Sequence, residues 1–367
     1  MTQRENEILE ILRNNPLISQ KNLAERLKIT RSSVAGHIMN LTNKGHIMGK
    51  GYIMKEKDYA LLIGGANMDI QGFPQNQLIS GDSNPGTVKV SCGGVARNIA
   101  ENMARLGLDV KLLTVVGGDS HGTQLIEESE AAGINMNEIL RLPGQSTSTY
   151  LSILNEKGDM AVAVSHMDIM DFFSLEYIRS KERLIKNASL IILDANLPAG
   201  IIQYIAETYR DIRIFMDPVS AVKALRIKES LPFIHMIKPN RMEAGYLTGL
   251  PVTNQEELEA AANALLEKGL KQVVISLGEE GVFFRSRNEK LLIPNLLVNP
   301  EEIVNATGAG DAFMAGFAYA QIKEMPPHES LRFALAASAL AISHENTINP
   351  NLSVENINQL IRNNQHE

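Results

Sequence analysis

The sequence predicts an α/β protein, with a mostly parallel sheet covered by helices on both faces and a small β lid, preceded by a small helical unit. Residues 1–57 carry ten Lys and Arg against five Asp and Glu, whereas the rest of the chain carries 25 against 37, so a basic unit precedes an acidic one. After residue 58, short apolar runs alternate with helical patterns, which is typical of parallel sheets. Two segments, about 70–92 and 147–165, alternate with period two and predict the lid strands.

The composition excludes several classes of protein. Apolar residues make up 44% of the chain and charged residues 21%, which argues against disorder. The single cysteine, Cys92, cannot form a disulfide within the chain, and the N-terminus mixes charges from its first residues, so we expect a cytoplasmic protein. No apolar run approaches the roughly 18 residues of a membrane helix, so no membrane partner is expected. The sequence also lacks the P-loop, dinucleotide-binding and HExxH zinc motifs.

Residues 1–57 predict three helices followed by a hairpin. The apolar spacing indicates helices over 4–14, 19–27 and 31–45, and residues 46–54 alternate around two glycines like a hairpin. This order resembles a winged helix-turn-helix, in which the third helix enters the major groove of DNA and the hairpin follows the phosphates. The resemblance implies DNA contacts by Arg31, Ser32, Ser33, His37 and Lys50. A protein-interaction module is the alternative, but the basic charge favours DNA as the partner.

The larger unit, residues 58–367, predicts a regular alternation of strands and helices. Strands are expected at 60–64, 110–115, 190–194, 212–216, 234–237 and 272–276. Helices are expected at 97–106, 120–132, 199–209, 240–248, 254–268, 309–323 and 328–343.

Residues 305–311, Asn-Ala-Thr-Gly-Ala-Gly-Asp, open one of these helices with small residues and an acid. We expect the peptide N–H groups of Gly308, Ala309 and Gly310 to be unpaired there, and together with the helix dipole they favour an anion. Asp311 then lies beside that anion, where its carboxylate can take a proton from an attacking hydroxyl. The alternative is a tight turn in which Asp311 only caps the helix.

A second junction between a strand and a helix carries Asn240 and Glu243, which lie three residues apart on one helical face. Such a pair suits a hard cation that keeps its waters, for example magnesium bridging phosphates. The alternative is a capping box, in which Asn240 caps the helix and Glu243 reaches back. The two roles are compatible.

Two further junctions offer contacts to a ligand. In Cys92-Gly-Gly-Val-Ala-Arg-Asn98, paired glycines allow a ligand to touch the backbone, and Asn98 offers a donor and an acceptor. In Gly64-Gly-Ala-Asn-Met-Asp69, an acid leaves the first strand and can accept two sugar hydroxyls, although taken alone Asp69 would be read as a loop residue.

Together and in this order, these elements resemble the ribokinase-like (PfkB-type) carbohydrate kinases over about residues 58–362. The resemblance rests on Asn67/Asp69, GGVARN (93–98), VGGDSHG (116–122), NRME (240–243), Ser276-Leu-Gly278 and TGAGD (307–311). It implies a doubly covered parallel sheet with a β lid that often also forms a homodimer interface. It further implies an ATP-dependent kinase that uses Mg²⁺.

The resemblance also implies residue roles. Asp311 is the expected catalytic base, and the amides of Gly308, Ala309 and Gly310 are the expected anion hole. The substrate is expected to contact Asn67, Asp69, Gly93, Gly94, Asn98, Thr149 and Asn196. ATP is expected to contact Asn240, Ser276, Gly278, Thr307 and Gly310. Asn240 and Glu243 are expected to bind magnesium.

Two positions depart from the family pattern. Asn305 stands where members activated by a monovalent cation carry an acid, which argues against potassium activation. Asn196 is often acidic in members that act on ribose, so its amide suggests another substrate. Within the family, the chain is most similar to pseudouridine kinases, which implies transfer of phosphate to the 5′-hydroxyl of a nucleoside. The alternatives are a kinase for ribose, adenosine, inosine or another sugar, and a ligand-sensing transcription regulator whose kinase fold only binds.

Overall fold

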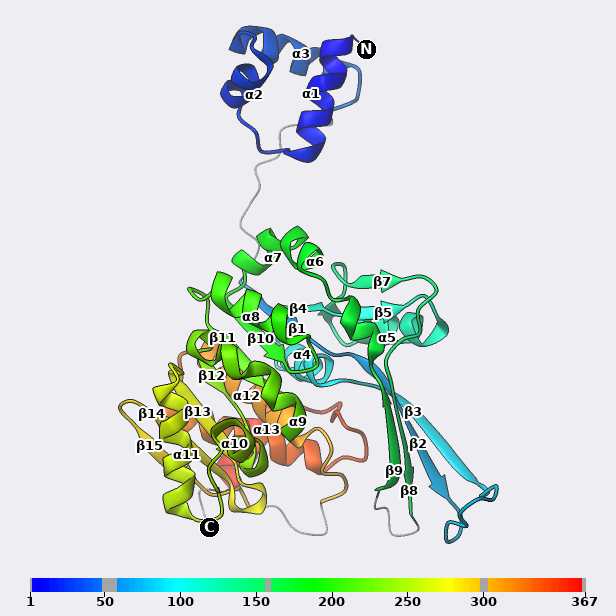
Figure 1. Cartoon of the computed structure of the whole chain (residues 1–367), viewed down its shortest axis with the longest axis vertical. Coiled ribbons are helices and arrows are strands. Elements are labelled where there is room, and N and C mark those ends of the chain that lie inside the picture. The colour runs from blue at the N-terminus through cyan, green and yellow to red at the C-terminus, as the bar shows by residue number, and fades with distance from the viewer. Residues whose placement is uncertain (1, 48–57, 156–159, 298–302, 365–367) are drawn as a thin grey trace. The chain divides into compact units, whose positions relative to one another are not determined.

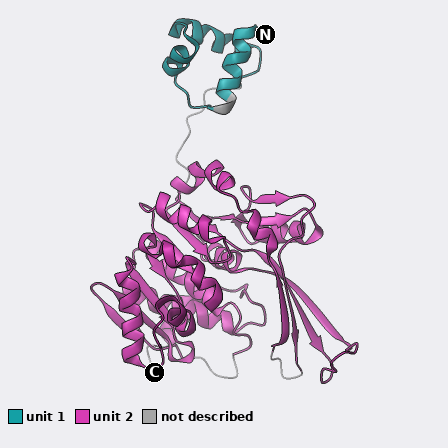
Figure 2. Cartoon of the chain, viewed as in Figure 1, with its two compact units in different colours: residues 1–55 teal, residues 56–367 magenta. Residues whose placement is uncertain are grey.

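The computed structural model describes residues 2–47, 58–155, 160–297 and 303–364, and the chain forms two compact units, residues 1–55 and 56–367 (Figure 2). None of the described helices is both long and apolar enough to cross a bilayer.

The N-terminal unit is a bundle of three short helices. They are α1 (Gln3–Asn14), α2 (Gln20–Leu27) and α3 (Arg31–Asn43). Each helix begins where a hydroxyl caps it, because the side chains of Thr2, Ser19 and Thr30 accept hydrogen bonds from backbone N–H groups three residues later. Apolar residues from all three helices form one core: Ile8, Leu9, Leu23, Ala24, Val34 and Leu41. The hairpin expected over residues 46–54 lies almost entirely outside the described residues. Lys50 lies outside them as well.

The larger unit is built on a nine-stranded sheet with the order β15-β14-β13-β12-β11-β10-β1-β4-β6 (Figure 1). Its strands are β1 (Ala60–Ile63), β4 (Val110–Leu113), β6 (Ile134–Asn135), β10 (Leu190–Asp194), β11 (Ile214–Asp217), β12 (Met236–Ile237), β13 (Gln272–Ser276), β14 (Val282–Ser286) and β15 (Lys290–Ile293). All neighbouring strands pair in parallel except β13–β14 and β14–β15, which are antiparallel.

Helices cover both faces of this sheet, as the sequence predicts. They are α4 (Val95–Arg105), α5 (Ser120–Ala131), α6 (Leu175–Ser180), α7 (Glu182–Lys186), α8 (Ala199–Thr208), α9 (Ala221–Ala224), α10 (Arg241–Thr248), α11 (Gln255–Glu267), α12 (Ala309–Ile322), α13 (Pro327–Ile342) and α14 (Val354–Asn363). Three 3-10 helices accompany them: η1 (Asp168–Phe172), η2 (Leu225–Phe233) and η3 (Gly278–Glu280).

Side chains alternate along the central strands, so the sheet carries two cores. Leu61 and Ile63 of β1 join the core beneath α8, α10 and α11, whereas Ala60 and Leu62 join the core beneath α4, α12 and α13. Burial on both faces explains why these strands are continuous apolar runs in the sequence.

A separate four-stranded sheet, with the order β3-β2-β8-β9, projects from the larger unit (Figure 1). Its strands are β2 (Asn67–Pro74), β3 (Gly86–Gly93), β8 (Thr149–Leu154) and β9 (Met160–His166). Their positions confirm the extra strands expected from the alternating segments. A small third sheet pairs β5 (Val115–Gly117) with β7 (Leu140–Leu142).

Candidate active site

Polar side chains gather where the parallel strands end. Asp194 is the last residue of β10, Asp217 is the last residue of β11, and Lys238 directly follows β12. Gly64 and Gly65 follow the neighbouring strand β1, and Ser276 ends β13. Because the carboxyl ends of parallel strands meet at one edge, these groups lie beside the crevice in which such sheets usually bind a ligand, with Asp194 itself fully buried.

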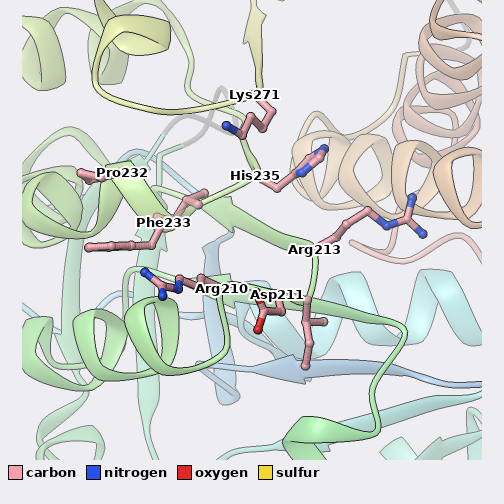
Figure 3. A pocket seen from close by; sticks show the side chains of 9 residues that line it. Arg210, Asp211, Arg213, Pro232, Phe233, His235 and Lys271 are labelled. Atoms are coloured by element: carbon pink, nitrogen blue, oxygen red, sulfur yellow. The ribbon is translucent and has the colours of Figure 1, made fainter.

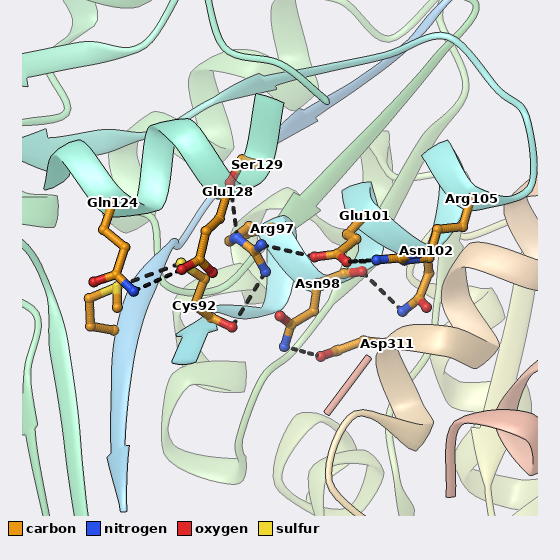
Figure 4. Close-up of polar contacts among 11 residues, drawn as sticks. Cys92, Arg97, Asn98, Glu101, Asn102, Arg105, Gln124, Glu128, Ser129 and Asp311 are labelled. Atoms are coloured by element: carbon orange, nitrogen blue, oxygen red, sulfur yellow. Dashed lines mark hydrogen bonds and ion pairs between the residues drawn. The ribbon is translucent and has the colours of Figure 1, made fainter. Parts of the chain in front are cut away.

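The carboxylate expected to act as the base lies at this edge. Asp311, in the first turn of α12, accepts a hydrogen bond from Nδ2 of Asn98 on α4 at 2.9 Å (Figure 4). Burial and the nearby carboxylate of Asp217 raise the pKa of Asp311 to about 8, although Asn98 and Lys238 oppose the shift. The fold therefore brings together two residues that are 213 positions apart in the sequence.

One polar atom of the Asn98 side chain still lacks a hydrogen-bond partner. Its Oδ1 is buried and has no hydrogen-bond partner within the described part of the chain. A buried acceptor without a partner costs free energy, so it indicates a group that is completed by a ligand. A hydroxyl bound beside Asp311 would supply the missing donor.

The start of α12 exposes backbone N–H groups as expected, with one difference. Within the residues that the structure describes, no acceptor pairs with the amides of Gly308 and Gly310. The amide of Ala309, in contrast, donates to the carbonyl of Ala306 at 3.4 Å, so the expectation that it is unpaired is wrong. Gly308 and Gly310 remain available to an anion at the positive end of the helix.

Asp69 forms the opposite wall of the crevice together with Asn67 and Gly93. Oδ1 of Asp69 accepts a hydrogen bond from Nδ2 of Asn67 at 2.6 Å, and burial raises the pKa of the carboxyl. A Cβ on Gly93 would lie 2.1 Å from Oδ2 of Asp69, so only glycine leaves space for this carboxylate. Gly94 has φ +100°, and a Cβ there would lie 2.6 Å from the backbone of Gly65 and Ala66.

Thr149 is the expected substrate contact that the structure separates from Asp69. The parallel register of β2 and β8 pairs Thr149 with Met68 and Tyr150 with Asp69. Because side chains alternate between faces, Tyr150 shares the face of Asp69 and Thr149 lies on the other face. A strand register set by tertiary pairing cannot be seen in the sequence of one strand alone.

Asn196 lies beside the same glycines. A Cβ on Gly65 would lie 2.6 Å from Nδ2 of Asn196, while Oδ1 of Asn196 accepts a hydrogen bond from Nζ of Lys223 at 2.6 Å. Oδ2 of the fully buried Asp194 accepts from the amides of Gly65 and Ala96, which fixes the two strand ends against each other. Asn196 is thus held rigidly with its amide nitrogen toward the crevice wall.

A cavity of about 790 Å³ adjoins the start of α12. Asn240, Ser276, Gly278, Ala309 and Gly310 line it on the polar side, and Leu297, Phe313, Leu335 and Ile342 are among its apolar lining residues. The size and the mixed lining suit a nucleotide, with phosphates at the helix start and a base against the apolar wall. Thr307 is exposed and does not line the cavity.

Asn240 and Glu243 form the capping box that the sequence left as an alternative. Oδ1 of Asn240 accepts from the amide of Glu243 at 2.8 Å, and Oε2 of Glu243 accepts from the amide of Asn240 at 2.9 Å. The cap occupies the oxygen of Asn240, so its Nδ2 is the group free to reach a phosphate. Burial raises the pKa of Glu243, whose Oε1 is not used by the cap.

Residues 57–354 match the family model described as pfkB family carbohydrate kinase. The chain belongs to this family. As a member, the protein is a phosphotransferase that acts on an alcohol group. Residues 1–48 of the kinase match the model described as winged helix-turn-helix DNA-binding.

Two curated relatives from Escherichia coli K12 resemble the kinase at 38% identity. One, the uncharacterized sugar kinase YeiI, aligns over 98% of the kinase and 99% of its own length. The other, a pseudouridine kinase, aligns over 84% of the kinase and 98% of its own length. A solved structure titled a putative ribokinase II from E. coli in complex with ATP and Mg²⁺ has the same fold, with a TM-score of 0.72 over 84% of the kinase and 100% of that chain at 19% identity.

Lys238 is a site residue of the kinase that the sequence analysis did not assign. Its Nζ lies 3.1 Å from Oδ2 of Asp217, and a Cβ on Gly310 would lie 3.3 Å from the same Nζ. Burial alone would lower the pKa of Lys238, but the carboxylates of Asp217 and Glu243 outweigh it and raise the pKa. The ammonium therefore borders the exposed amides. Its position directly after a buried strand is the sequence signal that could have found it.

Asn305 already has partners in the kinase. Its Nδ2 donates to the carbonyl of Glu345 at 3.1 Å, and its Oδ1 accepts from the amide of Thr307 at 2.9 Å. An amide N–H thus occupies the carbonyl oxygen of Glu345.

The N-terminal unit presents the expected polar residues at the start of α3. Arg31, Ser32 and Ser33 are exposed and His37 is half-buried. The hydroxyls of Ser32 and Ser33 lie 2.9 and 3.0 Å from that of Thr30, so they also support the helix cap.

Proposed function

We propose that the kinase transfers the γ-phosphoryl group of ATP to the 5′-hydroxyl of pseudouridine. One observation carries the kinase chemistry: the Asp311 carboxylate is held by Asn98 beside the open amides at the start of α12. The choice of nucleoside is supported by the pseudouridine kinase that is 38% identical over 84% of this chain.

In this mechanism Asp311 is the general base. The substrate oxygen attacks the γ-phosphorus, its proton passes to the Asp311 carboxylate, and the bond to the leaving ADP oxygen breaks. Burial makes the ionised carboxylate a stronger base than an exposed aspartate, because its pKa rises to about 8. Negative charge on the moving phosphoryl group is met by the amides of Gly308 and Gly310 and by the ammonium of Lys238.

The substrate is oriented by polar groups on the other wall. Asp69 can accept hydrogen bonds from two ribose hydroxyls, and Asn67 holds its carboxylate in place. Oδ1 of Asn98 can accept a hydrogen bond from a second hydroxyl of the substrate, while the attacking hydroxyl gives its proton to Asp311. We assign Gly93, Gly94 and Asn196 to the same pocket, and we add Tyr150 in place of Thr149.

We propose that ATP binds the 790 Å³ cavity through Asn240, Ser276, Gly278 and the α12 amides. Magnesium bound to its phosphates would neutralise charge that develops during transfer. The described residues contain no cluster of three or more His, Cys, Asp or Glu side chains, and a magnesium that bridges phosphates normally takes only one or two carboxylates. Glu243, with its Oε1 outside the cap, fits that requirement.

A second candidate is a kinase for another nucleoside or sugar, favoured by YeiI, the sugar kinase that is similar over nearly the whole chain. ADP release should be measured with ATP and a panel of pseudouridine, uridine, adenosine, inosine, ribose and deoxyribose. We expect the highest kcat/KM with pseudouridine. A higher value with any other member would overturn the substrate. No ADP release with the whole panel would favour a ligand-sensing regulator.

We further propose that the N-terminal domain, residues 1–57, binds DNA, with Arg31, Ser32, Ser33 and His37 toward the bases. The support is the match of residues 1–48 to a DNA-binding family and the excess of Lys and Arg in this unit. The kinase would act in the cytoplasm as a homodimer formed through the projecting sheet.

A further inference from the structure

A second cavity, of about 410 Å³, lies at the edge of the main sheet opposite the active site. Arg213, His235 and Lys271 each directly precede one of the strands β11, β12 and β13, so they stand at the amino ends of three neighbouring parallel strands (Figure 3). The remaining lining residues are Arg210, Asp211, Ile212, Pro232, Phe233 and Ile234. The strands separate this cavity from Asp217 and Lys238, which lie at their carboxyl ends.

The cavity concentrates positive charge in the acidic part of the chain. Neighbouring strands lie about 4.8 Å apart, and Arg213 and Lys271 precede β11 and β13, two strand spacings apart with His235 between them, so the two cations repel each other unless something neutralises them. Within the part of the chain that the structure describes, Arg210, Arg213 and Lys271 form no ion pair, and Asp211 is the only acid in the lining. Partial burial and the charges of Arg213 and Lys271 lower the pKa of His235.

The free donors also point to an anion. Nη1 of Arg213 donates to the carbonyl of Gln321 at 3.2 Å, which fixes the guanidinium while leaving its other nitrogens available. Arg210 and Lys271 are exposed and lie on either side of Phe233, which is half-buried (Figure 3). Guanidinium and ammonium groups bind phosphate through charge-assisted hydrogen bonds, and an aromatic wall suits a ring attached to it.

We propose that this cavity binds a small organic phosphate, namely a phosphate monoester of about nucleotide size, independently of the catalytic site. Its volume falls in the range of small-molecule sites and leaves room for more than inorganic phosphate. Arg210, Arg213 and Lys271 contact the phosphate, and Phe233 contacts the organic part.

Equilibrium dialysis of the full chain against radiolabelled uridine 5′-monophosphate and, separately, orthophosphate tests the proposal. Two variants change the net charge equally at the same sheet edge: Lys271→Glu alters the cavity, and the exposed Arg287→Glu lies outside its lining. We expect Lys271→Glu to weaken one class of nucleotide binding by at least about tenfold and Arg287→Glu to leave it unchanged. Kinase kcat/KM should stay within about twofold of wild type in both variants.

The remaining outcomes separate the possible ligands. If orthophosphate bound as tightly as the nucleotide, the cavity would be a site for inorganic phosphate and not for a phosphate ester. Identical binding to wild type and both variants, or equal losses in both variants, would overturn the proposal. Because binding is read without turnover, a failure of the proposed kinase substrate leaves this test intact. Lys271→Gln serves as a second variant if Lys271→Glu does not fold.

Discussion

The carboxylate of Asp311 is held in an environment that disfavours its charge, which suits the role of base that we propose for it. Burial and Asp217 raise its pKa to about 8, whereas an exposed aspartate titrates near 3.8. Its partner Asn98 is itself left with an unpaired Oδ1. Two polar groups thus carry unfavourable energy in the free protein that a bound hydroxyl can relieve.

Replacing Asp311 by Asn should remove the base while keeping the shape. We expect Asp311→Asn to lower kcat by about 10²- to 10⁴-fold, which is the usual contribution of a general base, with little change in the KM for ATP. Steady-state ADP release measures this change. Asp82→Asn, in an exposed loop, is the control that should keep full activity. A variant at Asp311 that kept most of its kcat would refute the assignment.

The raised pKa of Asp311 also predicts how the protein responds to pH. The folded state binds this proton more tightly than the unfolded chain, so the stability it adds at low pH is lost as pH rises from about 4 to about 8. The Asp311→Asn variant does not lose this stability as pH rises. The amount by which its Tm exceeds the wild-type Tm should therefore grow over this pH range. In wild type, kcat/KM should fall below about pH 8 as the free enzyme's base is protonated. A Tm difference that does not vary with pH would contradict the shift.

Gly93 tests the opposite wall of the pocket. A Cβ at this position would collide with Oδ2 of Asp69, so Gly93→Ala should displace that carboxylate. We expect the KM for the nucleoside to rise at least about tenfold, because a bidentate contact to ribose is lost, while the KM for ATP changes little. Gly200→Ala, in α8, meets no neighbouring atom and is the matched control. Equal effects of the two variants would argue against Asp69 as a substrate contact.

Sequence reasoning recovers the residues that begin or end elements and misses those that depend on pairing. Asn98 and Asp311 are found because each opens a helix after small residues, and their contact confirms that placement. Thr149 is misplaced because the register between β2 and β8 decides which face it takes. Lys238 could have been found as a residue that directly follows a buried strand, but its place beside Gly310 is set by the fold.

At the scale of elements, the projecting sheet has two unlike faces. One face carries polar side chains, among them Asp69, Lys89 and Tyr150, and Lys89 reaches Asn346 of the main body at 2.7 Å. The other face is apolar and exposed, and it comprises Val88, Val90, Leu151, Val162 and Val164. A sheet that turns its polar face to the pocket and its apolar face to solvent is suited to pair with a second copy.

This apolar face predicts a homodimer that a single charge disrupts. Val162 is 56% exposed at the centre of β9, and Val162→Glu would place a carboxylate without a partner in the interface. We expect the dissociation constant to rise at least about tenfold in sedimentation velocity experiments. Val222→Glu introduces the same charge at a 74% exposed valine on α9, away from this sheet, and should leave the dimer unchanged. A wild-type protein that sediments as a monomer at all concentrations would end the dimer proposal.

Element prediction succeeds for the buried centre of the main sheet and fails at its edge. The central strands β1, β10, β11, β12 and β13 are apolar runs because both faces of the sheet are covered. Each of them is expected within a few residues of its bounds. The antiparallel hairpin of β14 and β15 is not expected, because Arg285 and Lys290 interrupt its apolar residues and face each other across the strands. In β15 one side is solvated, with Lys290 and Leu292 exposed, so this strand lacks the continuous apolar run on which the prediction depends.

At the scale of the whole molecule, the chain joins units of opposite charge. Residues 1–57 carry an excess of five positive charges, whereas the rest carries an excess of twelve negative ones. A polyanion such as DNA is attracted to the first and repelled by the second. We expect nucleotides still to bind the acidic unit, because the open amides at the start of α12 and the ammonium of Lys238 favour an anion locally.

This charge division predicts that DNA binding depends on the N-terminal unit and on salt. Affinity of the full chain for a short DNA duplex of mixed sequence, measured by fluorescence anisotropy, should fall steeply as salt rises, since bound phosphates release counterions. Arg31→Ala should weaken binding by about tenfold at low salt and reduce the salt slope by about one, while leaving kcat/KM unchanged. Lys228→Ala, an exposed cation of the larger unit, is the control and should alter neither. If binding were insensitive to salt, or if the two variants lost affinity equally, the exposed start of α3 would not be the DNA-binding surface.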